Sequence, residues 1–156
     1  MNRTTARQLA IQLSFAAAAS GREAPELAEE FFSPEHFETL AAEDELYAER
    51  PTGKSLDYIL RLTSLTAEKR EELDAVIARH AQGWRPERIS RTALAVLRCA
   101  ICEILYFDDV PESAAINEAV EGDKLYDTPE TVAFVNGVLG GFVRALHAGE
   151  AATEET

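Results

Sequence analysis

The stretch FVNGVLGG, residues 134–141, decides between two folds. Asn136-Gly137 between apolar residues is a strong signal for a β-hairpin. As a strand, however, the stretch would mix apolar residues with glycine or asparagine on both faces. As a helix it gathers its large apolar residues on one broad stripe and leaves Asn136 and the glycines toward the other side. The stretch therefore predicts a helix, although each interior glycine costs roughly 0.8–1 kcal/mol relative to alanine. Close helix packing and close approach of a ligand or partner are the two reasons that would justify that cost.

Helical spacing of apolar residues continues through the rest of the chain, and strand patterns are absent from it. Gly21 ends the first predicted helix, and prolines begin two short acidic helices after it. Thr66 is expected to cap the helix that follows it, and Asp127 or Thr128 to cap the last one. The longer predicted helices cover residues 3–20, 54–65, 67–81, 91–107 and 111–126, with a final helix from Pro129.

Length and composition predict one folded domain. The chain has 156 residues, of which 46% are hydrophobic, and this suffices for a single core. We expect one helical domain over 1–148 and a disordered acidic tail over 149–156. No apolar run approaches the roughly 18–20 residues that span a bilayer, and the N-terminus lacks a secretory signal. The sequence thus predicts a cytoplasmic protein without a membrane partner.

The charge is negative overall but unevenly spread. The net charge is −13, which argues against indiscriminate binding to nucleic acid or anionic membranes. Residues 1–22 nevertheless carry Arg3, Arg7 and Arg22 and no carboxylate. This basic end is either a local phosphate-facing patch or an ordinary solvated first turn.

No residue pattern indicates catalysis or a cofactor. The sequence lacks the H-E-x-x-H, G-x-S-x-G and P-loop motifs, and its three histidines are scattered. Cys99 and Cys102 have the C-x-x-C spacing of redox and metal sites, but they sit inside an apolar helical run without enough further ligands for zinc. We interpret them as small buried hydrophobic residues. The sequence predicts no enzyme, no metal and no cofactor.

Several segments together resemble the NusB family of bacterial transcription antitermination factors. The two C-terminal segments are the most specific, and the others occur in the expected order. These segments are AINEAVE (115–121), FVNGVL (134–139), ARQLAIQLSF (6–15), WRPERI (84–89) and LRCAICEIL (97–105). The resemblance implies an all-α fold of about seven helices in two packed helical sub-bundles. It also implies a non-enzymatic protein that binds boxA-type single-stranded RNA together with NusE, a small-subunit ribosomal protein. The pair then acts on the RNA polymerase elongation complex and supports ribosomal RNA synthesis.

The resemblance assigns an RNA surface to both ends of the chain. Arg3 and Arg7 match the basic N-terminus of the family, and Phe15 takes its aromatic position. Phe134 and Asn136 come from the final motif. Proteins bind single-stranded RNA by placing cations against its phosphates and by stacking aromatic rings on its unstacked bases. Phe15 and Phe134 are alternatively core residues, and Asn136 is alternatively a capping or interhelical hydrogen-bonding residue.

The resemblance also assigns a NusE contact to three carboxylates, Glu103, Glu112 and Glu130. An acidic face suits a basic ribosomal protein. Glu103 and Arg98 lie inside the central apolar helix, however. The alternative for both is a buried ion pair or hydrogen-bond network with neighbours such as Glu118 or Glu121.

The sequence departs from the family where charge matters for RNA. Thr4 and Thr5 stand where further basic residues are common, and Gly122-Asp123 replaces apolar residues. Each lost phosphate contact weakens RNA binding. A second hypothesis is therefore a NusB-like scaffold that binds only proteins, with weak or no affinity for RNA.

Overall fold

The structure is a computed structural model that describes residues 1–155, without the side chains of Pro86 and of 150–155. Every regular element in this range is helical, and the described backbone contains no strand. The chain forms two compact units, Met1–Lys69 and Arg70–Thr156. The predicted all-α fold is confirmed, with eight α-helices where about seven were expected. The expectation of a single domain over 1–148 stays a prediction.

The first unit contains four α-helices and one short 3-10 helix. The side chain of Asn2 caps the first helix by accepting a hydrogen bond from the Thr5 amide at 2.8 Å. Gly21 ends that helix with φ of 72°, a left-handed conformation that glycine adopts without strain. The elements are α1 (Arg3–Ser20), α2 (Ala24–Phe31), α3 (Pro34–Leu40), η1 (Glu45–Tyr47) and α4 (Gly53–Glu68).

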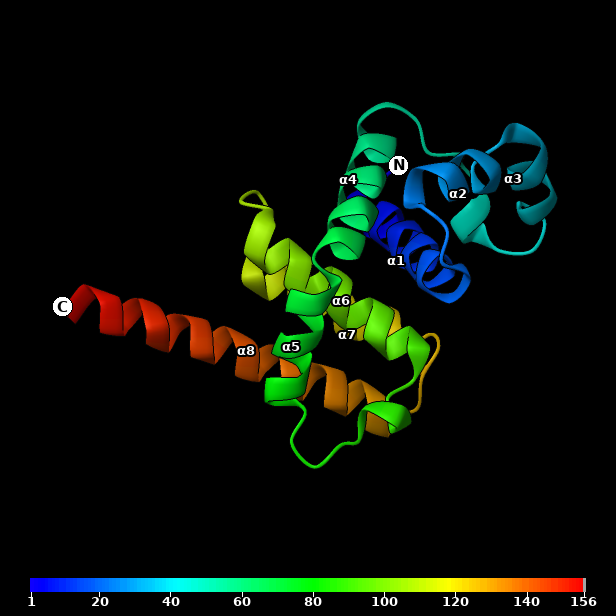
Figure 1. Cartoon of the computed structure of the whole chain (residues 1–156). Helices are drawn as coiled ribbons and strands as arrows, with labels where there is room; N and C mark the ends of the chain where they lie inside the picture. The colour runs from blue at the N-terminus through cyan, green and yellow to red at the C-terminus, as the bar shows by residue number, and fades with distance from the viewer. Residues whose placement is uncertain (156) are drawn as a thin grey trace. The chain divides into compact units, whose positions relative to one another are not determined.

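The core of the first unit forms where α1 packs against α4 (Figure 1). Leu9 and Leu13 of α1 and Ile59 and Leu62 of α4 are fully buried. A cluster of aromatic rings connects α2, α3 and η1, and neighbouring rings in it meet edge to face or tilted, as aromatic pairs prefer. Its members are Phe31, Phe32, Phe37 and Tyr47.

The second unit is built around α6, which contacts every other α-helix of the unit (Figure 1). Ten of its residues are buried, and this agrees with the prediction of a central helix that is apolar over much of its surface. The Ser90 hydroxyl caps its N-terminus by accepting from the Ala93 amide at 3.0 Å. The elements are α5 (Arg70–His80), η2 (Pro86–Arg88), α6 (Arg91–Tyr106), α7 (Glu112–Asp123) and α8 (Pro129–Glu155).

The stretch at 134–141 is helical, as predicted, and forms the middle of α8. Its large apolar residues are buried, while Asn136 and Gly137 face outward. Thr128 caps the helix, since its hydroxyl accepts from the Thr131 amide at 3.3 Å. The buried stripe consists of Phe134, Val135, Val138, Leu139 and Phe142.

Two element boundaries differ from the prediction. Thr66 does not begin a helix, because α4 continues through it to Glu68 and its hydroxyl donates to the Leu62 carbonyl at 2.7 Å. This back-bond satisfies the buried hydroxyl inside the helix and removes it as a cap. At the other end, α8 runs to Glu155, beyond the boundary expected at 148. Disorder of 149–156 stays a prediction, and Thr156 lies outside the described residues.

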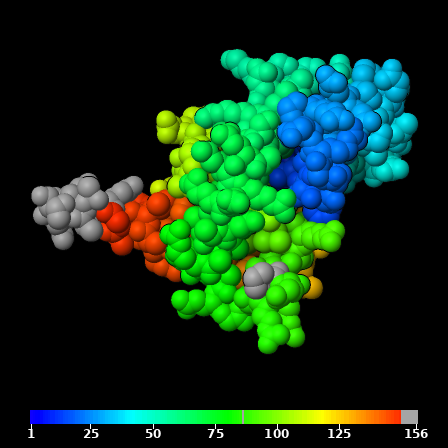
Figure 2. Space-filling model, in the orientation of Figure 1, coloured from blue at the N-terminus to red at the C-terminus, as the bar shows by residue number. Residues whose placement is uncertain are grey.

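The segment Pro129–Gly149 of α8 is long and apolar enough to cross a membrane by length and composition, contrary to our expectation for this chain. Four valines, two leucines and two phenylalanines supply most of its hydropathy. The helix packs one face against α5, α6 and α7, and in Figure 2 its orange part extends beyond the green surface of α5. One such helix is weak evidence for a membrane span.

Candidate nucleic-acid and partner interface

Arg3 is the exposed arginine of the first turn of α1. Its guanidinium carbon lies 4.1 Å from the centre of the Tyr58 ring on α4, a cation–π geometry. Tyr58 itself is buried. The ring holds the guanidinium in place, so Arg3 presents a positioned guanidinium group at the surface of the first unit.

Arg7 and Phe15 differ in accessibility: Arg7 is buried, whereas Phe15 is exposed. Arg7 is only 6% exposed, although it lies one turn from Arg3. Phe15 is 38% exposed, so it is not a core residue and solvent reaches part of its surface. Of the predicted N-terminal residues, Arg3 and Phe15 are therefore the two that solvent reaches.

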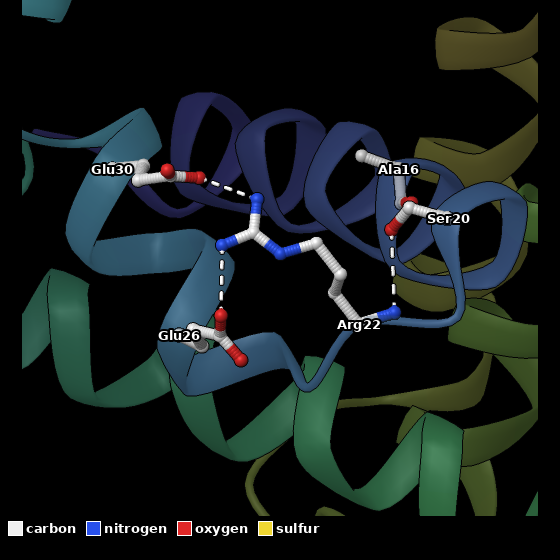
Figure 3. Close-up of polar contacts among 5 residues, drawn as sticks. All are labelled: Ala16, Ser20, Arg22, Glu26 and Glu30. Carbon is white, nitrogen blue, oxygen red and sulfur yellow. Dashed lines mark hydrogen bonds and ion pairs between the residues drawn. The ribbon is translucent and has the colours of Figure 1, made fainter.

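Arg22 does not add to the basic end, because two carboxylates of α2 neutralise it (Figure 3). Its guanidinium donates to Glu30 at 2.5 Å and to Glu26 at 2.9 Å. The hydrogen bond to Glu30, and then that to Glu26, raise the pKa of Arg22 above its ordinary value. The same side chains line a surface groove of about 730 Å³ with Leu27, Glu29, Phe31, Ser33 and His36. This part of the unit is acidic on balance.

Phe134 and Asn136 lie on different faces of α8. The Phe134 ring is 8% exposed and packs on Trp84, with ring centres 4.5 Å apart and planes inclined by 35°. Asn136 is exposed and lines a groove of about 550 Å³ between α7 and α8, together with Lys124 and Val132. Most of the Phe134 surface is buried, as expected from the alternative that Phe134 is a core residue.

The three carboxylates assigned to a partner have different surroundings. Glu130 is exposed in the first turn of α8. Glu112, at the start of α7, lies 2.7 Å from Nε2 of His147 on α8 and is partly exposed. Glu103 is fully buried in the described chain, because α6 is covered nearly all round. It presents no surface to a partner in this conformation, so the predicted contact is retained only for Glu112 and Glu130.

Arg98 is buried and ion-paired, as the structural alternative held, but with a different neighbour. Its Nε donates to Oδ1 of Asp74 at 2.7 Å, and its Nη2 donates to Oδ2 of Asp74 at 3.1 Å. Asp74 belongs to α5, and the expected partners Glu118 and Glu121 belong to α7. This two-point geometry fixes α5 against α6.

Comparisons with known proteins agree with these features. The model of the NusB family matches residues 4–144, most of the chain. A protein of Symbiobacterium thermophilum named transcription antitermination protein NusB is 34% identical over 99% of this chain and 97% of its own length. One of the same name from Thermoanaerobacter sp. is 35% identical over 96% and 97%. The chain belongs to the NusB family.

Solved structures of NusB proteins share the fold. T. maritima NusB matches with a TM-score of 0.67 and 24% identity, over 92% of each chain. The solution structure of Aquifex aeolicus NusB matches with a TM-score of 0.68 and 21% identity, over 95% of this chain and 93% of that one. At these identities the likeness establishes the fold alone.

Membership of the NusB family confirms that the chain is not an enzyme, because the family consists of non-enzymatic transcription factors. The cysteines agree with the packing interpretation, since Cys99 and Cys102 are 1% and 0% exposed and form no disulfide. Within the described residues, no group of three or more His, Cys, Asp or Glu side chains is placed to hold a metal.

Two features of this NusB chain escaped the sequence analysis. One is a set of exposed arginines, Arg85, Arg88 and Arg91, in and after the WRPERI segment. The local density of arginine in an acidic chain would have revealed it. The other is an acid pair at the turn between α7 and α8, formed by the buried Asp123 and the partly buried Asp127, for which the sequence carried no clear signal.

Proposed function

We propose that this chain is a transcription antitermination factor that binds boxA-type single-stranded RNA together with NusE, and so acts indirectly on the elongating RNA polymerase. The observation that carries the proposal is the family match over 4–144, which includes both C-terminal motifs. Such a factor meets nascent RNA in the bacterial cytoplasm, and this is where we place it.

The exposed residues supply the chemistry that RNA binding needs. Arg3 offers a positioned guanidinium group for a phosphate, and the exposed Phe15 offers a ring for a base. Asn136 offers an amide at the groove beside α8. Arg7 is better assigned to the structure of the first unit, because it is nearly inaccessible.

The proposed NusE surface is carboxylate-rich. Glu112 and Glu130 are both accessible, and a basic ribosomal protein would be attracted to them. Rim charges of this kind act mainly on the association rate and its salt dependence. Substitution of Glu130 by glutamine is therefore expected to slow NusE association at low salt more than at high salt.

The test is fluorescence anisotropy of a short labelled boxA-type RNA, with the protein alone and with NusE, at two salt concentrations. Binding should weaken with salt and tighten with NusE. Arg3→Gln and Phe15→Ala should each weaken it. Arg22→Gln is the matched control, because it removes the same charge from a guanidinium already neutralised by Glu26 and Glu30.

The protein-only scaffold is the second candidate, and the acidic groove around Arg22 favours it. A net charge of −13 opposes RNA binding at any site that lacks a concentrated positive patch. Absence of RNA binding at both salt concentrations, with NusE still captured by the folded protein, would replace the first proposal by this one.

A further inference from the structure

The loop between α5 and η2 forms a small notch in the surface of the second unit. Gly83, with φ of 83°, turns the chain into Trp84. Trp84, Arg85 and Arg88 then line a cavity of about 290 Å³, with Glu130 of α8 on its rim. The indole is only partly buried, and its covered side rests on Phe134 at 4.5 Å between ring centres. The notch therefore has a rigid aromatic wall and a partly open face.

Positive charge is concentrated around this notch. Residues 79–91 carry four arginines and one carboxylate, in a chain whose net charge is −13. Arg85, Arg88 and Arg91 are exposed. None of the three has an ion-pair partner among the described side chains, whereas Arg22 and Arg98 are each held by carboxylates. Unneutralised guanidinium groups retain their full attraction for an anion.

We propose that this notch is a second contact site for single-stranded RNA, in which Arg85 and Arg88 bind phosphates and the open face of Trp84 stacks on a base. The inference rests on the proposed function and extends the RNA surface to residues that the family resemblance did not assign. Phe134 packs against the covered side of the indole and restricts its orientation. The Glu130 carboxylate repels phosphate, so the strand passes on the arginine side of the notch.

RNA is favoured over an acidic peptide because the site combines a ring with cations. Bases stack on aromatic side chains, and alanine substitution of such platforms costs about 1–3 kcal/mol per base. Aspartate and glutamate side chains gain nothing comparable from an indole face. A peptide would need only the charges, and charges alone would not explain why Trp84 is backed by a second ring.

Trp84 is the single tryptophan of the chain, so its fluorescence reports on the notch directly. Titration with unlabelled boxA-type RNA in the presence of NusE should quench this emission over the same concentration range in which labelled RNA gains anisotropy, after correction for the emission of NusE. Arg85→Gln/Arg88→Gln should lower affinity about tenfold at low salt. It should also reduce the slope of log K against log salt by about 1.4, the loss of two phosphate contacts on a single strand.

The matched control is Lys54→Gln/Arg144→Gln, which removes the same charge from exposed positions that do not line the notch. It should leave the slope and the quenching unchanged. RNA binding without quenching, with the same salt slope in both double variants, would contradict the proposal that the notch binds RNA. It would leave the proposed function unaffected. No RNA binding by the wild-type chain would overturn both. Quenching by polyglutamate but not by RNA would assign the notch to acidic peptides instead.

Discussion

Asp123 and Asp127 pair their carboxyl groups at the turn between α7 and α8. Asp123 is fully buried, and both of its carboxylate oxygens and Oδ2 of Asp127 lack a hydrogen-bond donor. Oδ1 of Asp127 accepts from the Ser90 hydroxyl at 3.0 Å. Two carboxylates can bond to each other only when one holds a proton. Burial, the hydrogen bond with Asp127 and its charge together raise the pKa of Asp123 to about 7.

This pair predicts that stability falls as pH rises from about 4 to about 7. In that window the folded chain keeps a proton on Asp123 that the unfolded chain has released, since the ordinary pKa is 3.8. The stabilising contribution is therefore complete below the unfolded pKa and is lost as pH rises through the folded one. The loss is at most about 1.4 kcal/mol per pH unit. Urea unfolding at several pH values measures it.

Asp123→Asn is the variant that isolates this contribution. Its amide donates to Asp127 at every pH, so the difference in unfolding free energy between variant and wild type should grow in favour of the variant as pH rises from about 4 to about 7, and should level off above pH 7. Asp109→Asn, an exposed change of the same kind, is the control. A difference that does not vary with pH would show that Asp123 is not protonated in the folded chain.

The ion pair between Arg98 and Asp74 predicts an asymmetric response to mutation. Asp74→Ala leaves a buried guanidinium without its two-point partner, and we expect a loss of about 1–3 kcal/mol in unfolding free energy. Arg70 also approaches Asp74, but at 3.9 Å and half exposed. Arg70→Ala should therefore change stability by less than about 0.5 kcal/mol. Equal losses of unfolding free energy in the two variants would mean that the buried pair with Arg98 stabilises the fold no more than the exposed contact with Arg70.

Burial of the two cysteines predicts chemical inertness. Cys99 and Cys102 are nearly inaccessible inside α6, so a thiol reagent should react with neither at a rate above that of unfolding. In denaturant both should react at once. Ellman's reagent monitors the reaction, with the denatured chain as the reference. Fast modification of one cysteine in the native protein would show that α6 opens locally.

How far the sequence predicts the structure depends on whether local pattern and burial point the same way. The helix at 134–141 was predictable because only a helix places all its large apolar residues on one side. The Thr66 boundary was wrong because a threonine hydroxyl can cap a helix or bond back inside it, and only the packing around it decides. The local sequence around a threonine can be the same whether its hydroxyl caps a helix or bonds back inside one.

The site residues show the same limit more strongly. Arg7 and Glu103 have the residue types that contact RNA and proteins, but tertiary packing covers both. Asp74 was missed as the partner of Arg98 because the spacing of residues does not show which neighbouring helix, α5 or α7, faces the Arg98 side chain. Phe15, in contrast, is exposed although its type suits a core. Residue type and spacing suggest chemistry, but accessibility depends on contacts that are distant in sequence.

The glycines of α8 give the last prediction, because their surroundings differ sharply. A Cβ at Gly141 would lie 3.2 Å from Nδ1 of His80 on α5, whose ring already contacts Phe142. A Cβ at Gly137 would meet nothing within 4 Å. Gly137→Ala should therefore stabilise the chain by about 0.5–1 kcal/mol, whereas Gly141→Ala should lose that gain or destabilise.

Gly137 consequently has no packing reason to be glycine within the second unit, and it stands beside the exposed Asn136. If the RNA backbone passes close to this turn of α8, the added methyl group should weaken RNA binding while it strengthens the fold. Denaturation and anisotropy on the same Gly137→Ala sample separate the two effects. A more stable protein with unchanged RNA affinity would place the RNA elsewhere on α8 and leave Asn136 without a role in its recognition.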